Sequence, residues 1–185
     1  MMCATSAIRF GRAAAHVLRR FRRDRRGIAA TEFALTLPVM LTMYLGTVEL
    51  SQGINAGRKV TQTARTVADL VSRVQTMNTA QMTNSFNAGV AVMAPYDAAN
   101  LKMTVTSVSI NSTGAVTVVW KKPFNGGVTS PLSVPAALLV PDSSLILAEV
   151  QYDYTPVVGY VLSGTFNLND KMYMRPRLSK EVEWN

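Results

Sequence analysis

The sequence predicts an α+β protein, in which a long N-terminal helix, first transmembrane and then amphipathic, packs on a small antiparallel sheet with one or two short helices. Three observations lead to this prediction. A single long apolar run stands near the N-terminus, apolar residues at helical spacing follow it, and the period changes to two after Leu101. The 185 residues suffice for one modest core and a tail.

The apolar run covers residues 28–48. As a helix with a rise of about 1.5 Å per residue it would be roughly 31 Å long, which matches the hydrocarbon core of a bilayer. We therefore expect a transmembrane helix over this range. Pro38 removes one backbone donor beside the carbonyl of Ala34, so the helix should kink there, and hydroxyls such as those of Thr36 and Thr42 can compensate.

Positive charge is concentrated before this run. The net charge is +8, and residues 1–27 hold eight arginines against one aspartate, so that the rest of the chain is nearly neutral. Segments rich in Lys and Arg stay cytoplasmic, and these arginines outweigh Arg58 and Lys59 after the run. We therefore expect a basic cytoplasmic leader at 1–27 and an outward-facing remainder.

The composition of the leader leaves alternatives open. Its Ala and Arg content also suits a mitochondrial transit peptide. A basic total can indicate a nucleic-acid partner, but here the charge belongs to the leader, so we expect none. Cys3 is the single cysteine and cannot form an internal disulfide, so the outward part must be held together by packing alone.

Glu32 is the one charge within the apolar run, and an ionised carboxylate in a membrane costs on the order of a few kcal/mol. An interfacial position near the start of the span is one explanation. The residues upstream offer another, because six arginines at 19–26 precede Gly27, and Glu32 is the fifth residue after that glycine. This arrangement resembles the prepilin signature of the type IV pilin superfamily, and Glu32-Phe33 resembles the Glu-aromatic pair of the tight-adherence (Flp) branch.

Two further segments, Glu149 to Pro156 and Met174-Arg175-Pro176-Arg177, are similar to those of the TadE/TadG-like proteins of tight-adherence pilus systems. The resemblance implies a TadE-like minor pilin or pseudopilin that takes part in Flp (Tad) pilus assembly. It also implies partners, namely a prepilin peptidase, other pilin-like subunits, the Tad secretion machinery and membrane lipid. The expected location is the bacterial inner membrane, with a cytoplasmic N-terminus and a periplasmic C-terminal head that is extracellular when in the pilus.

The same resemblance assigns roles to four residues. It implies that the peptidase cleaves between Gly27 and Ile28, and that Glu32 and Phe33 serve assembly. Cleavage would create an ammonium group at Ile28, and the spacing of Glu32 from it leads to the hypothesis that Glu32 of one subunit pairs with this group of the next and sets the register between subunits. An uncleaved, signal-anchored periplasmic protein that binds envelope components is the alternative. It would keep the first 27 residues, so the N-terminal residue of the protein recovered from cells separates the two interpretations.

No catalytic site is expected. The sequence has no Cys or His outside the leader, no cluster with metal-ligand spacing, no Gly-rich phosphate loop and no nucleophile elbow. Asp142, Asp153 and Asp170 are scattered over different segments, so they form no obvious acid and base pair. We therefore expect no enzymatic activity, no metal and no cofactor.

Residues 49–95 are expected to form an amphipathic helical region. Gly53 and Gly57 have the small-xxx-small spacing that allows close helix packing, although they could simply loosen the exit from the membrane. A second, shorter helix is predicted at about 79–94, ended by Pro95. The apolar stripe that should pack on the outer domain consists of Val60, Ala64, Val67, Val71 and Val74.

Residues 96–185 are expected to form the β-rich part of the head. Alternation at 101–105 and 116–120 around the turn 111–114 predicts a hairpin, with a bulge near Thr106 because Val108 and Ile110 fall out of phase. We expect a loop with two solvated lysines at 121–127, a short helix at 133–139 and the strongest strand at 145–154, in a sheet of three or four strands. Arg175 and Arg177 are expected on a solvated edge strand or against a partner.

Overall fold

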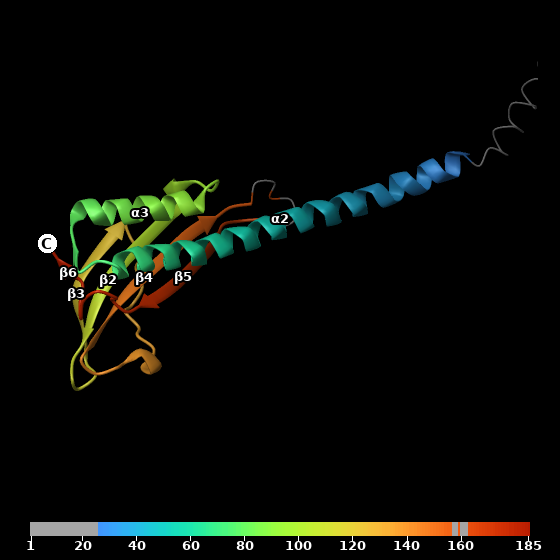
Figure 1. Ribbon diagram of the computed structural model, residues 1–185. Helices are drawn as coiled ribbons and strands as arrows, with labels where there is room; N and C mark the ends of the chain where they lie inside the picture. Colours follow the sequence, from blue (N-terminus) through green and yellow to red (C-terminus); the bar gives the residue numbers. More distant parts are fainter. Residues whose placement is uncertain (1–25, 157–158, 160–162) are drawn as a thin grey trace, which may run out of the picture. The chain divides into compact units, whose positions relative to one another are not determined.

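The computed structural model describes residues 26–156, 159 and 163–185, and residues 1–25 of the predicted leader lie outside them (Figure 1). The chain divides into two compact units, one up to Leu45 and one from Gly46 to Asn185. The predicted α+β class is confirmed. The helices and strands are α2 (Arg26–Ser72), β1 (Thr76–Met77), α3 (Thr79–Met93), β2 (Leu101–Ile110), β3 (Val116–Phe124), β4 (Ser143–Tyr154), β5 (Phe166–Met174) and β6 (Glu183–Trp184), with 3-10 turns η1 (Ala98–Asn100) and η2 (Ala136–Leu138).

Helix α2 joins the predicted transmembrane helix and the apolar stripe in one helix of 47 residues. It continues through Pro38 without a break. The hydroxyl of Thr36 donates to the carbonyl of Glu32 over 3.0 Å, and that of Thr42 donates to the carbonyl of Pro38 over 2.8 Å. Pro38 has no N–H to donate to the Ala34 carbonyl. The hydroxyls of Thr36 and Thr42 bond to other carbonyls of the helix, so they do not supply the donor that the Ala34 carbonyl lacks.

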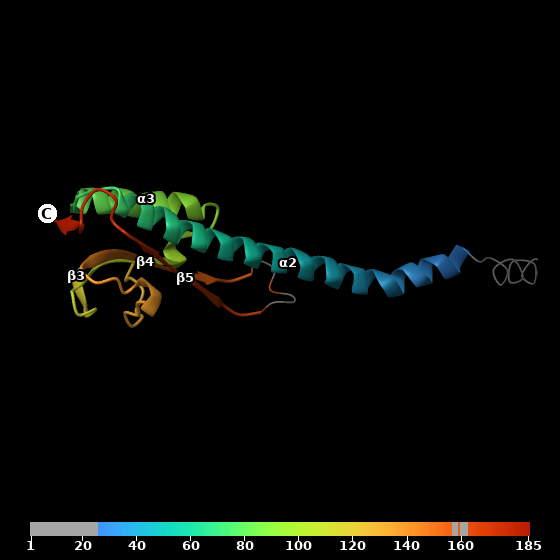
Figure 2. The ribbon, with the colours of Figure 1, turned by 60° about the horizontal axis from the view of Figure 1, so that its bottom comes forward.

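Within the second unit, the C-terminal part of α2 and helix α3 lie side by side over one face of the sheet (Figures 1 and 2). The predicted stripe is confirmed, because Val60, Ala64, Val67 and Val71 are buried in the core and Val74 packs half-buried at its edge. The sheet is antiparallel in the order β3-β2-β4-β5, which places β3 and β5 at its edges.

Helix α3 lies where the second helix was predicted, and it stops before Pro95 as expected. Its first turn is fixed by a capping box between Asn78 and Gln81, which the prediction did not include. Between the two ends of α3, Gly89 faces Val67 of α2 and Met103 of β2. A Cβ at Gly89 would lie 2.9 Å from both the Met103 Sδ and the Val67 Cγ2 atoms. The missing side chain therefore sets how closely α3 approaches the core.

The hairpin of β2 and β3 is confirmed, with Gly114 at φ +81° in the turn. The pairing shifts register between Ser107 and Val108 because β3 carries an extra residue, Val119. A bulge thus occurs in the hairpin close to Thr106, where one was expected, and its extra residue belongs to β3.

Strand β2 keeps its alternation, and the change in hydrophobic phase has another cause. Val105 faces the helices, whereas Val108 and Ile110 face the opposite side of the sheet. There they form a small second core with Leu145, covered by the segment around η2. The residues that pack against this second core are Val116, Val134, Leu138 and Leu139.

Two local expectations between the strands need correction. Strand β3 runs to Phe124, so Lys121 and Lys122 belong to a strand and not to a loop. Pro123 is compatible with this because β3 is an edge strand, where a missing N–H is tolerated. The helix expected at 133–139 is reduced to the single 3-10 turn η2, which follows Pro135.

The C-terminal segment crosses back to the helices. Strand β6 pairs in parallel with β1, and the Trp120 Nε1–H donates to the Val182 carbonyl over 2.7 Å. Arg177 lies after β5 and not on an edge strand, and its backbone N–H donates to the Ser72 carbonyl over 2.8 Å. The expectation of a solvated edge strand at Arg177 is therefore wrong, since the segment is tied to the end of α2.

Candidate membrane-spanning and assembly segment

The first part of α2 exposes apolar side chains along its length. Its most apolar stretch of 18 residues has a mean hydropathy of 1.5, and none of that stretch is buried in the protein. Phe33 is 60% exposed and Leu35 is 77% exposed. Such a surface on a helix of this length suits hydrocarbon better than water. The large exposed apolar residues are Ile28, Phe33, Leu35, Leu37, Val39, Met40, Leu41, Met43 and Tyr44.

The predicted cleavage site lies in the first turn of this helix. Gly27 is the second residue of α2, and Ile28 follows it with its side chain half exposed. A Cβ at Gly27 would meet nothing within 4 Å. Within the described residues, Gly27 and Ile28 are therefore not covered by another segment of the chain.

Glu32 and Phe33 lie one turn further along α2. Glu32 is four residues after Ile28, which places the two on the same side of the helix with a rise of about 6 Å between them. The Glu32 side chain is exposed and makes no ion pair with the residues that the structure describes. A carboxylate on a lipid-facing surface is costly unless something pairs with it.

A second acid marks the other end of the apolar segment. Glu49 is 1% exposed, in contrast to Glu32, and lies near a cluster formed by Tyr96, Tyr152 and Tyr154. Burial raises the pKa of Tyr154, and the neighbouring charges of Tyr96 and Glu49 add to the effect. No role for Glu49 was predicted from the sequence. Glu49 is buried against residues far along the chain, and no pattern in the neighbouring sequence reveals such burial.

The two glycines of the predicted helix-packing pair have different surroundings. A Cβ at Gly53 would lie 3.6 Å from Cε1 of Tyr154, so Gly53 faces the chain's own sheet. A Cβ at Gly57 would meet nothing within 4 Å. Close packing between α2 and α3 occurs instead at Gly89, which no spacing pattern identified. Packing of another chain against Gly53 and Gly57 remains a prediction.

Two ion pairs of the head lie on the face of the sheet that the helices leave uncovered. Glu149 is buried, and its Oε1 lies 2.8 Å from the Lys171 Nζ and accepts a hydrogen bond from Ser130. Asp153 pairs with Lys102 at 3.2 Å. Partial burial opposes ionisation of Asp153, but hydrogen bonds from Lys102, Gln151 and Asn167 outweigh it and lower the pKa of that carboxyl.

These ion pairs and hydrogen bonds neutralise the carboxylates of Glu149 and Asp153. In residues 26–156, 159 and 163–185, no three His, Cys, Asp or Glu side chains lie together in a way that could hold a metal. Asp142, Asp153 and Asp170 remain on separate segments, as the sequence indicated. His16 and Cys3 lie outside the described residues.

Among the described residues, one helix is long and apolar enough to cross a membrane, and together with the α+β head that follows it this indicates the class of a membrane-anchored protein. Residues 27–69 match the model of the family described as TadE-like protein. The chain is thus TadE-like over most of α2, and the resemblance inferred from Gly27, Glu32 and Phe33 is confirmed there. Neither a curated protein nor a solved structure matches the chain. All six predicted site residues, from Gly27 to Gly57, lie within the matched segment.

The match over residues 27–69 and the exposed apolar helix fit a membrane-anchored protein related to the Tad pilus. The matched segment ends within α2, so the likeness of Glu149 to Pro156 and of Met174 to Arg177 rests on the sequence alone.

Proposed function

We propose that this chain is a minor pilin or pseudopilin that takes part in assembly of the Flp (Tad) pilus. It is anchored in the bacterial inner membrane with its N-terminus in the cytoplasm and its head in the periplasm. A prepilin peptidase cleaves it between Gly27 and Ile28. The observation that carries the proposal is Glu32, an exposed carboxylate one turn after Ile28 in an otherwise apolar surface.

Cleavage changes the charge at the start of the helix. Hydrolysis of the bond between Gly27 and Ile28 leaves an ammonium group on Ile28, where a neutral amide stood before. The new N-terminus then carries a positive charge about 6 Å along the helix axis from Glu32. Both charges are unfavourable in lipid when alone, so each gains from a partner of opposite sign.

A neighbouring subunit supplies that partner. If two spans pack with an offset of about one helical turn, the Glu32 carboxylate of one lies beside the Ile28 ammonium of the other. Unit charges about 4 Å apart attract by roughly 4 kcal/mol at an effective dielectric constant near 20, before the cost of desolvation is subtracted. The pair therefore fixes the offset between subunits, and it exists only after cleavage.

Phe33 contributes to the same contact through its ring. It follows Glu32 directly and is largely exposed, so it lies against the neighbouring span when the charges pair. Gly57, whose surroundings are open, offers a further point of close approach. The partners of the chain are thus other pilin-like subunits, membrane lipid, the peptidase and the Tad secretion machinery.

Replacement of Glu32 by Leu tests the assembly role. The variant should insert into the membrane as well as the unchanged protein, because it removes a charge from the span. Its recovery with sheared pilus or assembly complexes should fall strongly. Thr42→Leu is the matched control, since it also turns a polar residue of the span into leucine but removes no charge. Unchanged incorporation of Glu32→Leu overturns the role of Glu32 in register.

Cleavage is tested separately by the N-terminal residue of the protein recovered from membranes. Ile28 is expected at the N-terminus of the processed protein, and Gly27→Leu should leave the leader attached. Recovery of the unchanged protein beginning at Met1 would favour the uncleaved, signal-anchored alternative.

A further inference from the structure

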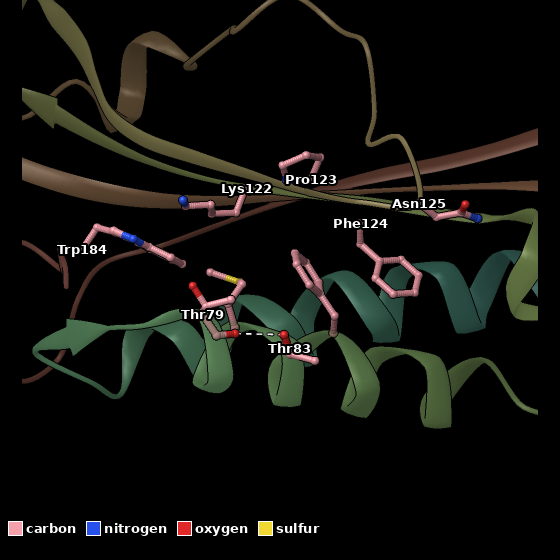
Figure 3. A pocket seen from close by; sticks show the side chains of 9 residues that line it. Thr79, Thr83, Lys122, Pro123, Phe124, Asn125 and Trp184 are labelled. Carbon is pink, nitrogen blue, oxygen red and sulfur yellow. Dashed lines mark hydrogen bonds between the residues drawn. The ribbon is translucent and has the colours of Figure 1, made fainter.

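A groove of about 300 Å³ opens between helix α3 and edge strand β3, on the side of the head where β6 ends. Figure 3 shows Lys122 and Trp184 at one end of it and Phe124 and Asn125 at the other, with Thr79 and Thr83 of α3 along one wall. Pockets that bind small ligands begin at about this volume, which also accommodates one or two large side chains. The groove is lined by Thr79, Met82, Thr83, Phe86, Lys122, Pro123, Phe124, Asn125 and Trp184.

The apolar wall of the groove is held in place by the core. Phe86 is buried and its ring centroid lies 5.4 Å from that of Phe124. At the other end, Trp184 packs against Trp120 with ring centroids 5.5 Å apart. Trp120 is itself fixed by its hydrogen bond to the Val182 carbonyl. Because these rings pack on core residues, the groove exists before any ligand arrives and binding costs little reorganisation.

A cation stands at the mouth of this apolar surface. The Lys122 Nζ lies 3.8 Å from the ring centroid of Trp184, a distance at which the ring holds an ammonium group. Lys122 forms no ion pair with the carboxylates of the described chain, in contrast to Lys102 and Lys171. The positive charge is thus positioned by an aromatic ring and left without a counter-charge beside an apolar groove.

The edge strand at this groove is poorly suited to pairing with an added strand. Pro123 has no backbone N–H to donate, and the bulge at Val119 interrupts the strand a few residues earlier. A ligand therefore enters the groove with its side chains and not by extending the sheet. Complementarity with the groove requires a large apolar group for the rings and a negative charge for Lys122.

We infer that this groove binds a segment of a partner protein in which a carboxylate stands next to a large apolar side chain. The apolar side chain lies in the groove between Phe124 at one end and Trp184 at the other (Figure 3), and the carboxylate forms an ion pair with Lys122. The inference is independent of the proposed cleavage and assembly roles, because the groove lies in the head and uses none of the residues of the span.

The test uses the full chain in detergent micelles and a defined probe, the peptide acetyl-4-nitrophenylalanyl-glutamate amide. The nitrophenyl group quenches tryptophan fluorescence on contact, so binding beside Trp184 is read as saturable quenching. The matched peptide with glutamine in place of glutamate lacks the charge alone. We expect the glutamate peptide to bind at least about fivefold more tightly, as an ion pair that is partly shielded from water provides.

Three variants assign the effect to the groove. Lys122→Gln should abolish the preference for glutamate, whereas Lys121→Gln should keep it, because alternate residues of β3 face opposite sides of the sheet. Thr83→Phe fills the groove from the exposed side of α3 without removing core atoms and should abolish quenching. Trp184→Phe should remove the quenched component of fluorescence and leave that of Trp120.

Several outcomes overturn the inference. They are an absence of saturable quenching, equal binding of the two peptides, and a preference for glutamate that survives Lys122→Gln. Far-UV circular dichroism of each variant establishes that the head is folded. If Thr83→Phe unfolds it, Thr79→Phe, one turn earlier in α3 and on the same groove, takes its place.

Discussion

The Arg177 guanidinium donates to the Asp69 carboxylate with 2.6 Å between Nη2 and Oδ1, although 108 positions separate the two residues. Asp69 also pairs with Arg73, the first residue after α2, at 2.5 Å. Together with the hydrogen bond from the Arg177 backbone to the Ser72 carbonyl, these contacts fasten the segment after β5 to the last turn of α2. The end of the long helix is therefore tied to the sheet through both backbone and side chain.

Loss of this pair should have a small but measurable effect. Arg177→Gln should lower the free energy of unfolding of the head by about 0.5 kcal/mol, because the Arg177 side chain is 55% exposed and solvent screens the pair. The backbone hydrogen bond to Ser72 survives the change. Urea unfolding followed by fluorescence measures it. Arg175→Gln is the control, and an equal loss in both variants would contradict a specific role for Arg177.

Gly89 and Gly57 should respond in opposite ways to alanine. Gly89→Ala places a Cβ 2.9 Å from the Val67 Cγ2, so the helices must separate, at a cost of about 1–3 kcal/mol. Gly57→Ala meets no atom within 4 Å and should be neutral or stabilising by up to about 1 kcal/mol, since alanine favours a helix. Thermal unfolding of both variants checks this. A stable Gly89→Ala protein would show that the α2 and α3 contact can relax.

The buried carboxylate of Glu149 depends on its partner. Lys171→Met leaves Glu149 with Ser130 as its donor, and we expect a loss on the order of 2 kcal/mol, reduced from that of a fully buried pair because Lys171 is partly exposed. Adding Glu149→Gln to this variant should recover part of the loss. Lys102→Met, which breaks a more exposed pair, should cost less. Equal losses from the two lysine changes would contradict the importance of burial.

Because the pKa of Asp153 is lowered in the folded protein, the free energy of unfolding depends on pH. A carboxyl whose folded pKa is depressed stabilises the fold fully above its unfolded pKa of about 3.9, and loses this contribution as the pH falls through the folded value. Asp153→Asn should therefore flatten the decline in stability below about pH 4. Unfolding midpoints between pH 2 and pH 7 measure the slope. Asp142→Asn, at an exposed turn position, should leave that slope unchanged.

The elements that the sequence predicted well are those whose cause is local. Helix α3 ends at Pro95 as expected, and the stripe on α2 follows from spacing along one helix. The expectations that failed concern contacts between distant segments. The change of phase at Val108 was attributed to a bulge, but Val108 is apolar because the segment near Leu138 covers that side of the sheet.

The candidate site divides in the same way. Gly27, Ile28, Glu32 and Phe33 could be identified from the sequence because their meaning lies in charge and spacing along one helix, and the TadE-like match covers that helix. Gly89 and the Lys122 groove could not be identified, since each combines residues of α3 with a strand far along the chain.

By itself, the sequence determined that this protein has a lipid-compatible helix with one acid near its start and a following α+β head. Hydropathy and periodicity depend on residues within a few helical turns of one another, so they can be recognised directly in the sequence. The tertiary structure alone decided that Asp69 holds Arg177, that Gly53 faces Tyr154, and that Lys122 rests on Trp184. Such contacts depend on how segments that are distant in the sequence pack together around a shared core. No pattern within a short stretch of sequence predicts that packing.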